Sequence, residues 1–267
     1  EAGSADRIDS VKGYRLKTNS TIFRNTSGIK GNAANFSARY FRDGDFLNTS
    51  DNADLSFGDY NFTIALWVKF NTIDSCCTMG IIGKYDGNLG GYLLYRVATP
   101  SVFQWDVVGS DLVVSSAKTN GEAPIKAGSW YFIVVWHDAT NNVVNISINN
   151  TRTNGTTHTS GVGDTALPFE LGTNDGGLDF YFNGSIDEVG IWNRILTNQE
   201  MTDLYNGSLG NTYVPYNYTG NFTSQVFDAN KSVNWSYISW ETHGAYQKEI
   251  GRADGDGFSI ADDSLVE

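Results

Sequence analysis

Hydrophobic and polar residues alternate in short runs along most of the chain. The clearest run, residues 62–70 (FTIALWVKF), places its large side chains on one face of an extended strand. Similar runs recur between Gly, Asn and Asp residues that are typical of turns. They cover residues 79–84, 91–97, 102–108, 112–116, 130–136 and 143–149. This spacing predicts an all-β fold, either a sandwich of two packed antiparallel sheets or a barrel. We favour the sandwich, with Trp67 and Trp130 in its core.

One short helix is predicted after residue 197. Thr197 and Glu200 have the spacing of a capping box, in which each side chain bonds the other residue's backbone amide. Asn206-Gly207 supplies an end for the helix. Its short apolar face consists of Met201, Leu204 and Tyr205.

Residues 182–197 (FNGSIDEVGIWNRILT), followed by Glu200 and Leu204-Tyr205, resemble the closing strand and helix of laminin-G-like, concanavalin A-like jelly rolls. Residues 31–36 (GNAANF), 62–68 and 128–136 resemble earlier strands of the same family, in the same order. The resemblance covers roughly residues 8–210 and implies a jelly-roll domain over residues 1–210. Because this fold serves many unrelated tasks, it says less about function.

The C-terminal segment, residues 211–267, is predicted to be β-rich. Residues 219–228 and 233–240 are strand candidates, and such pairs resemble the opening of a second sandwich in microbial surface proteins. The segment is short for an independent core. It either packs on the jelly roll as an appendage or exchanges strands with a neighbouring subunit.

Charge and hydropathy exclude several partners. The formal net charge of −12 disfavours nucleic acid and gives no help in binding anionic lipid. No apolar run approaches the roughly 20 residues of a membrane helix, so this segment is not expected to insert into a membrane. The chain has neither an initiator Met nor a signal peptide and is interpreted as a processed or excised segment.

Asn-X-Ser/Thr acceptor triplets (sequons) are unusually dense. Random placement of the 26 asparagines predicts roughly 4 or 5 sequons, whereas the chain has 14. The preference of Asn and Thr for turns explains the composition but not this spacing. We therefore predict N-glycosylation and an extracellular, cell-surface location. The acceptors are Asn19, Asn25, Asn35, Asn48, Asn61, Asn145, Asn149, Asn154, Asn183, Asn206, Asn217, Asn221, Asn230 and Asn234.

The only two cysteines, Cys76 and Cys77, are adjacent. Neighbouring residues can close only a strained ring, so a disulfide across the fold within one chain is excluded. Two free thiols, a vicinal disulfide and a bond to another chain remain open. The three histidines lack the spacing of a zinc site.

A structural calcium ion (Ca²⁺) is implied mainly by the resemblance. In many concanavalin A-like jelly rolls the Asp of the closing strand binds calcium, and Asp187 matches that position. In pentraxin-like relatives, loops comparable to Asn174, Asp175 and Asp179, and to Asp86, supply further ligands. The alternative is that these acids are solvated turn residues.

Carbohydrate binding is the other property that the resemblance implies. Sugar sites combine an aromatic platform with amide and acid hydrogen-bonding groups. About half of the aromatic residues in a strand belong to the core. The strand candidates for such a site are Tyr92, Tyr95, Trp105 and Asp106.

Catalysis is not expected. Glycanase relatives carry Glu-X-Asp-X-X-Glu on one strand, and the sequence lacks this motif. Asp187 and Glu188 are neighbours, so a regular strand directs them to opposite faces. The leading hypothesis is a glycosylated structural or adhesive subunit of a surface filament or coat, with itself or neighbouring surface proteins as partners. The alternative is a calcium-dependent, lectin-like module that binds glycans.

Overall fold

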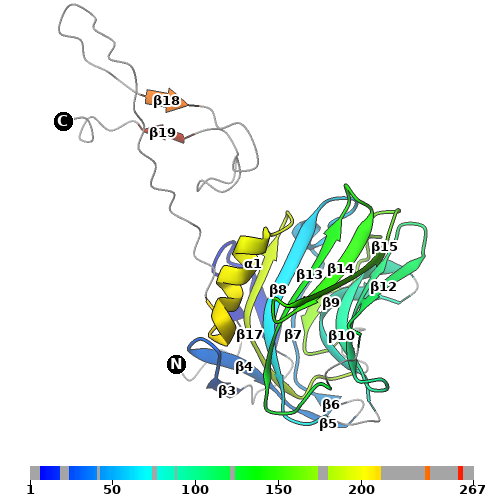
Figure 1. The fold of residues 1–267 in the computed structure, drawn as a ribbon, viewed down its shortest axis with the longest axis vertical. Coiled ribbons are helices and arrows are strands. Elements are labelled where there is room, and N and C mark those ends of the chain that lie inside the picture. Colours follow the sequence, from blue (N-terminus) through cyan, green and yellow to red (C-terminus); the bar gives the residue numbers. More distant parts are fainter. Residues whose placement is uncertain are drawn as a thin grey trace, which may run out of the picture. The chain divides into compact units, whose positions relative to one another are not determined.

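The computed structural model describes residues 7–18, 24–40, 43–73, 77–87, 89–120, 124–173, 180–211, 238–240 and 258–260. The chain divides into two units, Glu1–Tyr213 and Val214–Glu267, which we describe separately. The first unit is a sandwich of two antiparallel sheets (Figure 1), so the predicted all-β fold is confirmed.

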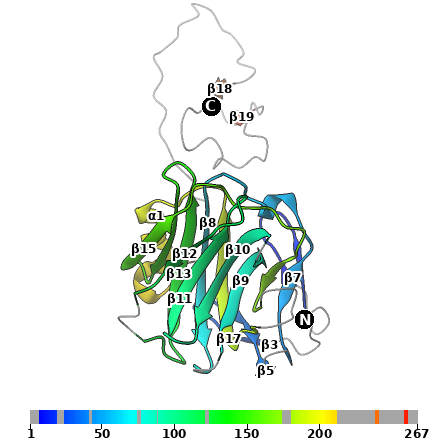
Figure 2. The same cartoon turned by 90° about the vertical axis from the view of Figure 1, so that its right-hand side faces the viewer.

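An eight-stranded sheet forms one layer of the sandwich (Figure 2). Apolar side chains of β9, β10 and β11 point inward at alternate positions, because side chains alternate between the faces of a strand. In spatial order the strands are β1 (Arg7–Ile8), β2 (Arg15–Thr18), β7 (Leu47–Thr49), β16 (Phe169–Leu171), β9 (Met79–Asp86), β10 (Gly90–Val97), β11 (Val102–Val108) and β12 (Val114–Lys118).

A seven-stranded sheet forms the other layer, with the long strand β8 at its centre. In spatial order its strands are β15 (Arg152–Thr157), β14 (Val143–Ile148), β13 (Trp130–Asp138), β8 (Phe62–Phe70), β17 (Gly184–Trp192), β4 (Asn32–Phe36) and β3 (Arg24–Ser27). The closing motif of the sequence is β17, which pairs with β8 and β4.

Two hydrophobic clusters stabilise the first unit. The larger one fills the space between the sheets and includes Phe62 and Trp105. The smaller one lies on the outer face of the seven-stranded sheet, under helix α1 (Asn198–Tyr205). Trp67 belongs to this second cluster and stacks on Tyr205, with ring centroids 5.8 Å apart. Its expected place between the sheets was therefore wrong, and Trp130 packs only at the margin of the same cluster.

Helix α1 begins as predicted. Thr197 accepts a hydrogen bond from the Glu200 amide, and Glu200 bonds back to the Thr197 amide, so the capping box is complete. Asn206 ends the helix in a left-handed conformation. Figure 1 shows α1 beside β8 and β17.

The remaining elements are short. They are η1 (Ala53–Leu55), the pair β5 (Ala38–Tyr40) and β6 (Asp43–Gly44), and η3 (Asn206–Ser208). In the second unit β18 (Ile238–Trp240) pairs with β19 (Phe258–Ile260). The predicted strand at residues 219–228 lies outside the described residues. The strand predicted at residues 112–116 begins only at Val114, because Leu112 has a φ of 65° and turns the chain.

Candidate functional site

The outer face of β9–β12 carries a cluster of aromatic and polar side chains. The register places Tyr95 beside Gln104 and places Asp106 beside Ser116, all on the face that points away from the core. The Tyr95 hydroxyl donates to Asp106 Oδ2 at 2.8 Å. Gln104 Nε2 donates to Asp106 Oδ1 at 2.8 Å and to Ser116 Oγ at 3.2 Å. We call Tyr85, Tyr95, Gln104, Asp106 and Ser116 the β9–β12 cluster.

Electrostatics keep the phenols of this cluster protonated. Burial and then the nearby Asp106 carboxylate raise the pKa of Tyr95 far above its usual range. Burial, followed by Asp106 and Asp86, raises the pKa of Tyr85. Both rings therefore remain neutral hydrogen-bond donors. The face carries two half-buried tyrosine rings and the Ser116 hydroxyl beside the Gln104 amide and the Asp106 carboxylate, which are 7 % and 5 % exposed, and these groups are of the kinds that bind sugar hydroxyls.

The four residues that the sequence predicted for sugar binding lie on two different faces of the sheet. Tyr92 and Trp105 point into the core, where their exposed fractions are 1 % and 0 %, so no ligand reaches them. Tyr92 instead donates to the Leu55 carbonyl at 3.0 Å. Tyr95 and Asp106 lie together on the outer face. Strand alternation also places Tyr85, Gln104 and Ser116 there, which the sequence reasoning missed.

Asp187 caps a turn on its neighbouring hairpin. Its Oδ2 accepts hydrogen bonds from the amides of Ile29 at 2.8 Å and Lys30 at 3.1 Å. Gly28 approaches so closely that a Cβ there would lie 2.2 Å from this oxygen. Burial raises the pKa of Asp187, and the amide hydrogen bonds oppose the shift. These contacts give Oδ2 the role of a turn cap.

The other expected calcium ligands give little further information. Asn174, Asp175 and Asp179 lie outside the described residues, and Asp86 ends β9. Across the described ranges, no three His, Cys, Asp or Glu side chains form a group that could hold a metal ion. Calcium binding therefore stays a prediction.

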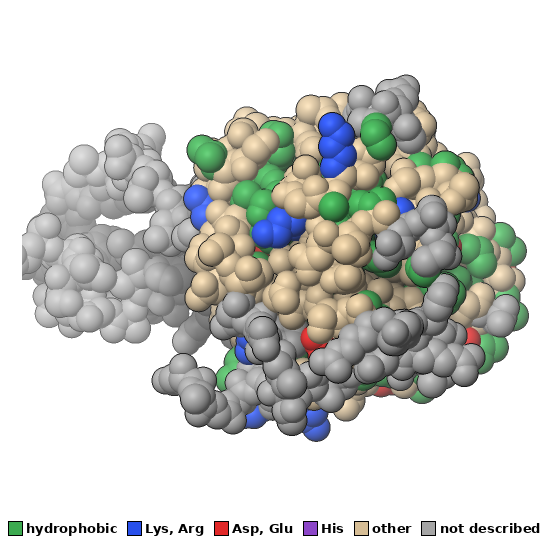
Figure 3. Space-filling model, turned by 90° about the horizontal axis from the view of Figure 1, so that it is seen from below, with side chains coloured by type: hydrophobic (Ala, Val, Ile, Leu, Met, Phe, Trp, Pro, Cys, Tyr) green, Lys and Arg blue, Asp and Glu red, His purple; other side chains and the backbone are tan. Residues whose placement is uncertain are grey.

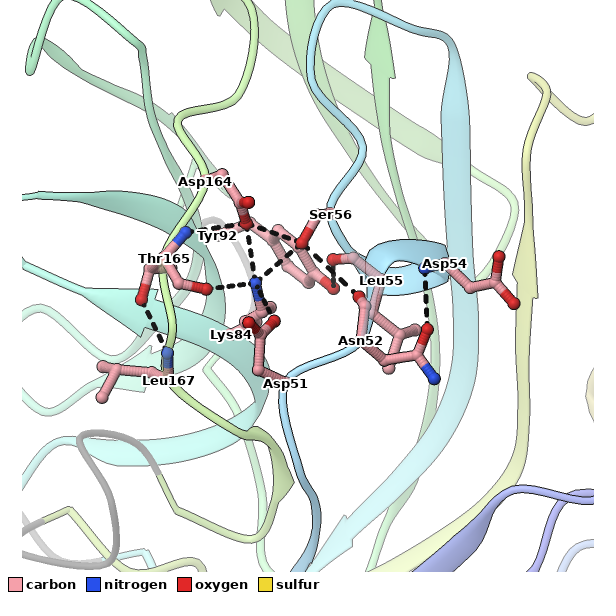
Figure 4. A network of polar contacts seen from close by, with 10 residues as sticks. All are labelled: Asp51, Asn52, Asp54, Leu55, Ser56, Lys84, Tyr92, Asp164, Thr165 and Leu167. Atoms are coloured by element: carbon pink, nitrogen blue, oxygen red, sulfur yellow. Dashed lines mark hydrogen bonds and ion pairs between the residues drawn. The ribbon is translucent and has the colours of Figure 1, made fainter.

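A buried lysine joins two loops at one end of the sandwich (Figure 4). Lys84 is 2 % exposed, and its Nζ donates to Ser56 Oγ at 2.8 Å and to the Thr165 carbonyl. Its two carboxylate partners, Asp51 and Asp164, each lie 2.9 Å away. The Ser56 hydroxyl and then Lys84 lower the pKa of Asp164. The amine is fully engaged, so we assign it a structural role.

Two buried histidines join the sheets at the same end. His158 Nε2 lies 3.1 Å from the Gly161 carbonyl, and its Nδ1 lies 3.0 Å from Ser115 Oγ. The His137 ring is 5.2 Å from the His158 ring, and its Nδ1 contacts the Tyr60 carbonyl at 2.9 Å. Burial and then His137 lower the pKa of His158. A neutral ring is therefore favoured at this position.

The family model of the concanavalin A-like lectin/glucanases superfamily matches residues 41–202. The chain belongs to this superfamily. We call the first unit, Glu1–Tyr213, the concanavalin A-like domain; the matched residues cover its strands β6–β17 and the β9–β12 cluster. No curated protein sequence matches the chain.

Solved structures share the fold at low sequence identity. The binding domain of Paraclostridial Mosquitocidal Protein 1 has a TM-score of 0.60 and 14% identity, with 75% of this chain and 49% of that chain covered. The binding domain of botulinum neurotoxin serotype G has a TM-score of 0.57 and 16% identity, with 75% and 48% covered. The binding domain of botulinum neurotoxin DC, in complex with SialylT, has a TM-score of 0.57 and 14% identity, with 76% and 48% covered. This chain spans about half the length of these domains, and the likeness shows the fold alone.

Sequons are distributed unevenly over the concanavalin A-like domain. Residues 62–144, which include all of β9–β12, contain no sequon. Asn48 on β7 lies in the same outer row as Asp106, but four strands away. Asn19, Asn217, Asn221, Asn230 and Asn234 lie outside the described residues, as does the side chain of Asn25. The described acceptors, all at least partly exposed, are Asn35, Asn48, Asn61, Asn145, Asn149, Asn154, Asn183 and Asn206.

Cys77 is disulfide-bonded, while Cys76 lies outside the described residues. Within the described ranges, no helix is long and apolar enough to cross a membrane.

Proposed function

We propose that the concanavalin A-like domain is a non-catalytic carbohydrate-binding domain of an extracellular surface protein. Its glycan would lie on the outer face of β9–β12. The observation that carries the proposal is the β9–β12 cluster, in which Tyr95 and Gln104 hold Asp106 beside a second tyrosine. Membership of a lectin and glucanase superfamily supports it.

The charges on this face favour an uncharged sugar. The carboxylates of Asp106 and Glu170 lie in one row of the outer face, and both phenols are neutral. Asp106 and Glu170 are only 5 % and 3 % exposed, but their charge would repel an anionic sugar such as a sialic acid. We therefore expect a neutral pyranose that stacks on Tyr85 or Tyr95.

The spacing of the same two carboxylates supports a binding role without catalysis. Glu170 and Asp106 are separated by β9 and β10, so three strand spacings, about 14 Å, lie between them. Glycosidases hold their two carboxyl groups roughly 5–10 Å apart. Asp106 is also engaged by two hydrogen bonds, which suits a fixed acceptor of ligand hydroxyls.

The positions of the sequons are compatible with glycan binding at β9–β12. Fourteen N-glycans could crowd a binding face, yet β9–β12 carry no acceptor. An extracellular location is itself inferred from the sequon density, and this face would remain uncovered in the glycosylated protein.

A glycan array probed with the purified full chain tests the proposal. We expect binding to a class of neutral glycans, and we expect Gln104→Ala to reduce it. The matched control is Gln199→Ala, which removes an exposed amide on α1, where Gln199 Nε2 donates to Asp203 Oδ1 at 2.8 Å. Absence of binding to any glycan, or equal binding by both variants, would refute the assignment of this face.

A surface-assembly role is the second candidate, and the unit Val214–Glu267 favours it. In its described residues this unit has one antiparallel pair, β18 and β19. A two-stranded ribbon is marginal alone and gains stability from added strands. Light scattering of the full chain would show concentration-dependent assembly, and a monomer at high concentration would contradict this role.

A further inference from the structure

Exposed apolar side chains gather at one end of the sandwich. Leu89 is 61 % exposed at the β9–β10 turn, and Leu112 and Val113 are each 57 % exposed at the β11–β12 turn. The register of β9–β12 brings both turns to the same end of the sheet, and Val114 adjoins them at the start of β12. We call Leu89, Leu112, Val113 and Val114 the apolar tip. Large exposed apolar side chains grouped in this way mark interaction surfaces.

The β11–β12 turn is held rigidly. The Gly109 amide donates to the Val113 carbonyl at 2.9 Å, and the Leu112 amide donates to the Gly109 carbonyl at 2.9 Å. Asp111 Oδ1 accepts from the Val113 amide at 3.1 Å and from Ser160 Oγ at 2.7 Å. Side chains on a turn fixed in this way lose little conformational freedom when they bind a partner.

The conformation of Leu112 is costly for its residue type. Its φ of 65° lies in the left-handed region, which suits Gly and Asn better than a branched side chain. Its side chain is largely exposed, so packing within the described residues does not offset this cost. An exposed leucine in this conformation suits a residue that contacts a partner.

Carboxylates surround the apolar tip. Asp86 ends the strand before Leu89, Asp111 precedes Leu112, and Asp59 packs against Gly161, whose carbonyl accepts the Ser110 amide at 3.1 Å. The Ser160 hydroxyl and the Val113 amide lower the pKa of Asp111, so it is ionised at neutral pH. No ion pair engages Asp59, Asp86 or Asp111 within the described residues. At the opposite end, which bears β5 and β6, the described residues include separate Lys and Arg side chains (Figure 3).

The apolar tip and the carboxylates beside it together indicate which kind of partner fits this surface. We propose that the apolar tip docks a partner protein segment whose apolar side chains are flanked by Lys or Arg. The carboxylates of Asp59, Asp86 and Asp111, which we call the acidic rim, would repel an anionic bilayer. Two apolar tips facing each other would bring like charges together. A segment with both apolar and basic side chains would pack its apolar groups on the apolar tip and pair its positive charges with the acidic rim.

A fluorescent peptide of repeated Lys-Leu-Leu units is the probe, and binding to the full chain is followed by anisotropy. Companion peptides carry Glu for Lys, or Ser for Leu. We expect the Lys-Leu-Leu peptide to bind best. Leu112→Asn and Val113→Ser should each weaken its binding about tenfold, because each removes one apolar anchor. Leu209→Ser, which changes an exposed leucine beyond α1, should leave binding unchanged.

Leu112→Asn also controls for folding. Asn tolerates the left-handed conformation, so we expect a thermal midpoint no lower than that of the wild type. Equal binding of the three peptides, or unchanged binding by both tip variants, would overturn the proposal. So would binding of phosphatidylcholine vesicles, or dimer formation by light scattering, if either depended on Leu112.

Discussion

The Tyr95 hydroxyl donates a 2.8 Å hydrogen bond to Asp106 on the adjacent strand, on the face of the sheet that points away from the core. Asp106 is only 5 % exposed, and Gln104 binds its other oxygen. A carboxylate held by two donors is a fixed acceptor, because rotating it would break both bonds. The proposed sugar site depends on this arrangement.

Tyr95→Phe should lower both stability and glycan affinity. The change deprives Asp106 of one donor, which we expect to cost about 1–3 kcal/mol of unfolding free energy. Urea unfolding measures this cost. Tyr14→Phe is the matched control, because its hydroxyl also bonds an aspartate, Asp54, but at an exposed position. The control should change stability by about 0.5 kcal/mol or less. Equal losses would contradict a special role for Tyr95.

An N-glycan attached to the outer face of β9–β12, where the strands carry no natural sequon, should block binding of the glycan ligand. Val114→Asn gives residues 114–116 the acceptor pattern Asn-Ser-Ser at the start of β12. We expect the glycosylated variant to lose binding on the glycan array. The same preparation should regain binding after enzymatic deglycosylation, which serves as its own control. Undiminished binding by the glycosylated variant would place the sugar site elsewhere.

Removing the carboxylates around Lys84 should lower the unfolding free energy more than removing the Lys84 amine. Removing both carboxylates by Asp51→Ala and Asp164→Ala leaves a buried amine uncompensated, which we expect to cost about 3 kcal/mol or more. Lys84→Met should cost less, because Asp51 and Asp164 are 44% and 70% exposed and can be hydrated. Chemical unfolding of both variants measures the difference, and a larger loss for Lys84→Met would contradict this account.

Mild acid should destabilise the fold through His158. Its pKa in the folded state is lowered from 6.5, so the unfolded state binds the proton more readily. Stability should therefore fall as the pH drops below about 6.5 toward the folded-state pKa. His158→Gln keeps a donor for the Gly161 carbonyl and should flatten this dependence. Thermal unfolding at several pH values tests it, and parallel profiles for both proteins would contradict it.

Substitution of Asp187 separates a turn cap from a calcium ligand. Asp187→Ala leaves the amides of Ile29 and Lys30 without their acceptor, at a cost of about 1–3 kcal/mol. Asp187→Asn retains one acceptor oxygen and should cost less. Thermal unfolding of both variants with calcium and with a chelator tests the assignment. A calcium-dependent stabilisation of the wild type that Asp187→Asn abolishes would show that this residue binds calcium.

Much of the fold could be predicted because the signals are local. The alternation at residues 62–70 and 102–108 matches β8 and β11, and the spacing of Thr197 and Glu200 gives the helix start. The start of β12 could not be predicted, because Leu112 still belongs to the β11–β12 turn. Its left-handed φ is one that leucine rarely adopts.

The sugar site was harder to predict because it depends on which face of each strand is buried. Trp105 and Asp106 are neighbours, so a strand cannot present both on one face. Tyr92 and Tyr95, three positions apart, are separated in the same way. The sequence shows this alternation, but only the packing of the second sheet decides that Tyr92 and Trp105 point inward. Asp187 likewise depends on contacts with a hairpin far away in the sequence.

The most direct measurement of the central claim is a glycan titration followed by backbone amide NMR of the full chain, with the best glycan from the array. We predict that the largest shift changes fall on Tyr85, Tyr95, Gln104, Asp106 and Ser116, and that Gln199 on α1 does not move. Shift changes confined to other parts of the domain, or none at saturating glycan, would contradict the assignment of carbohydrate binding to the outer face of β9–β12.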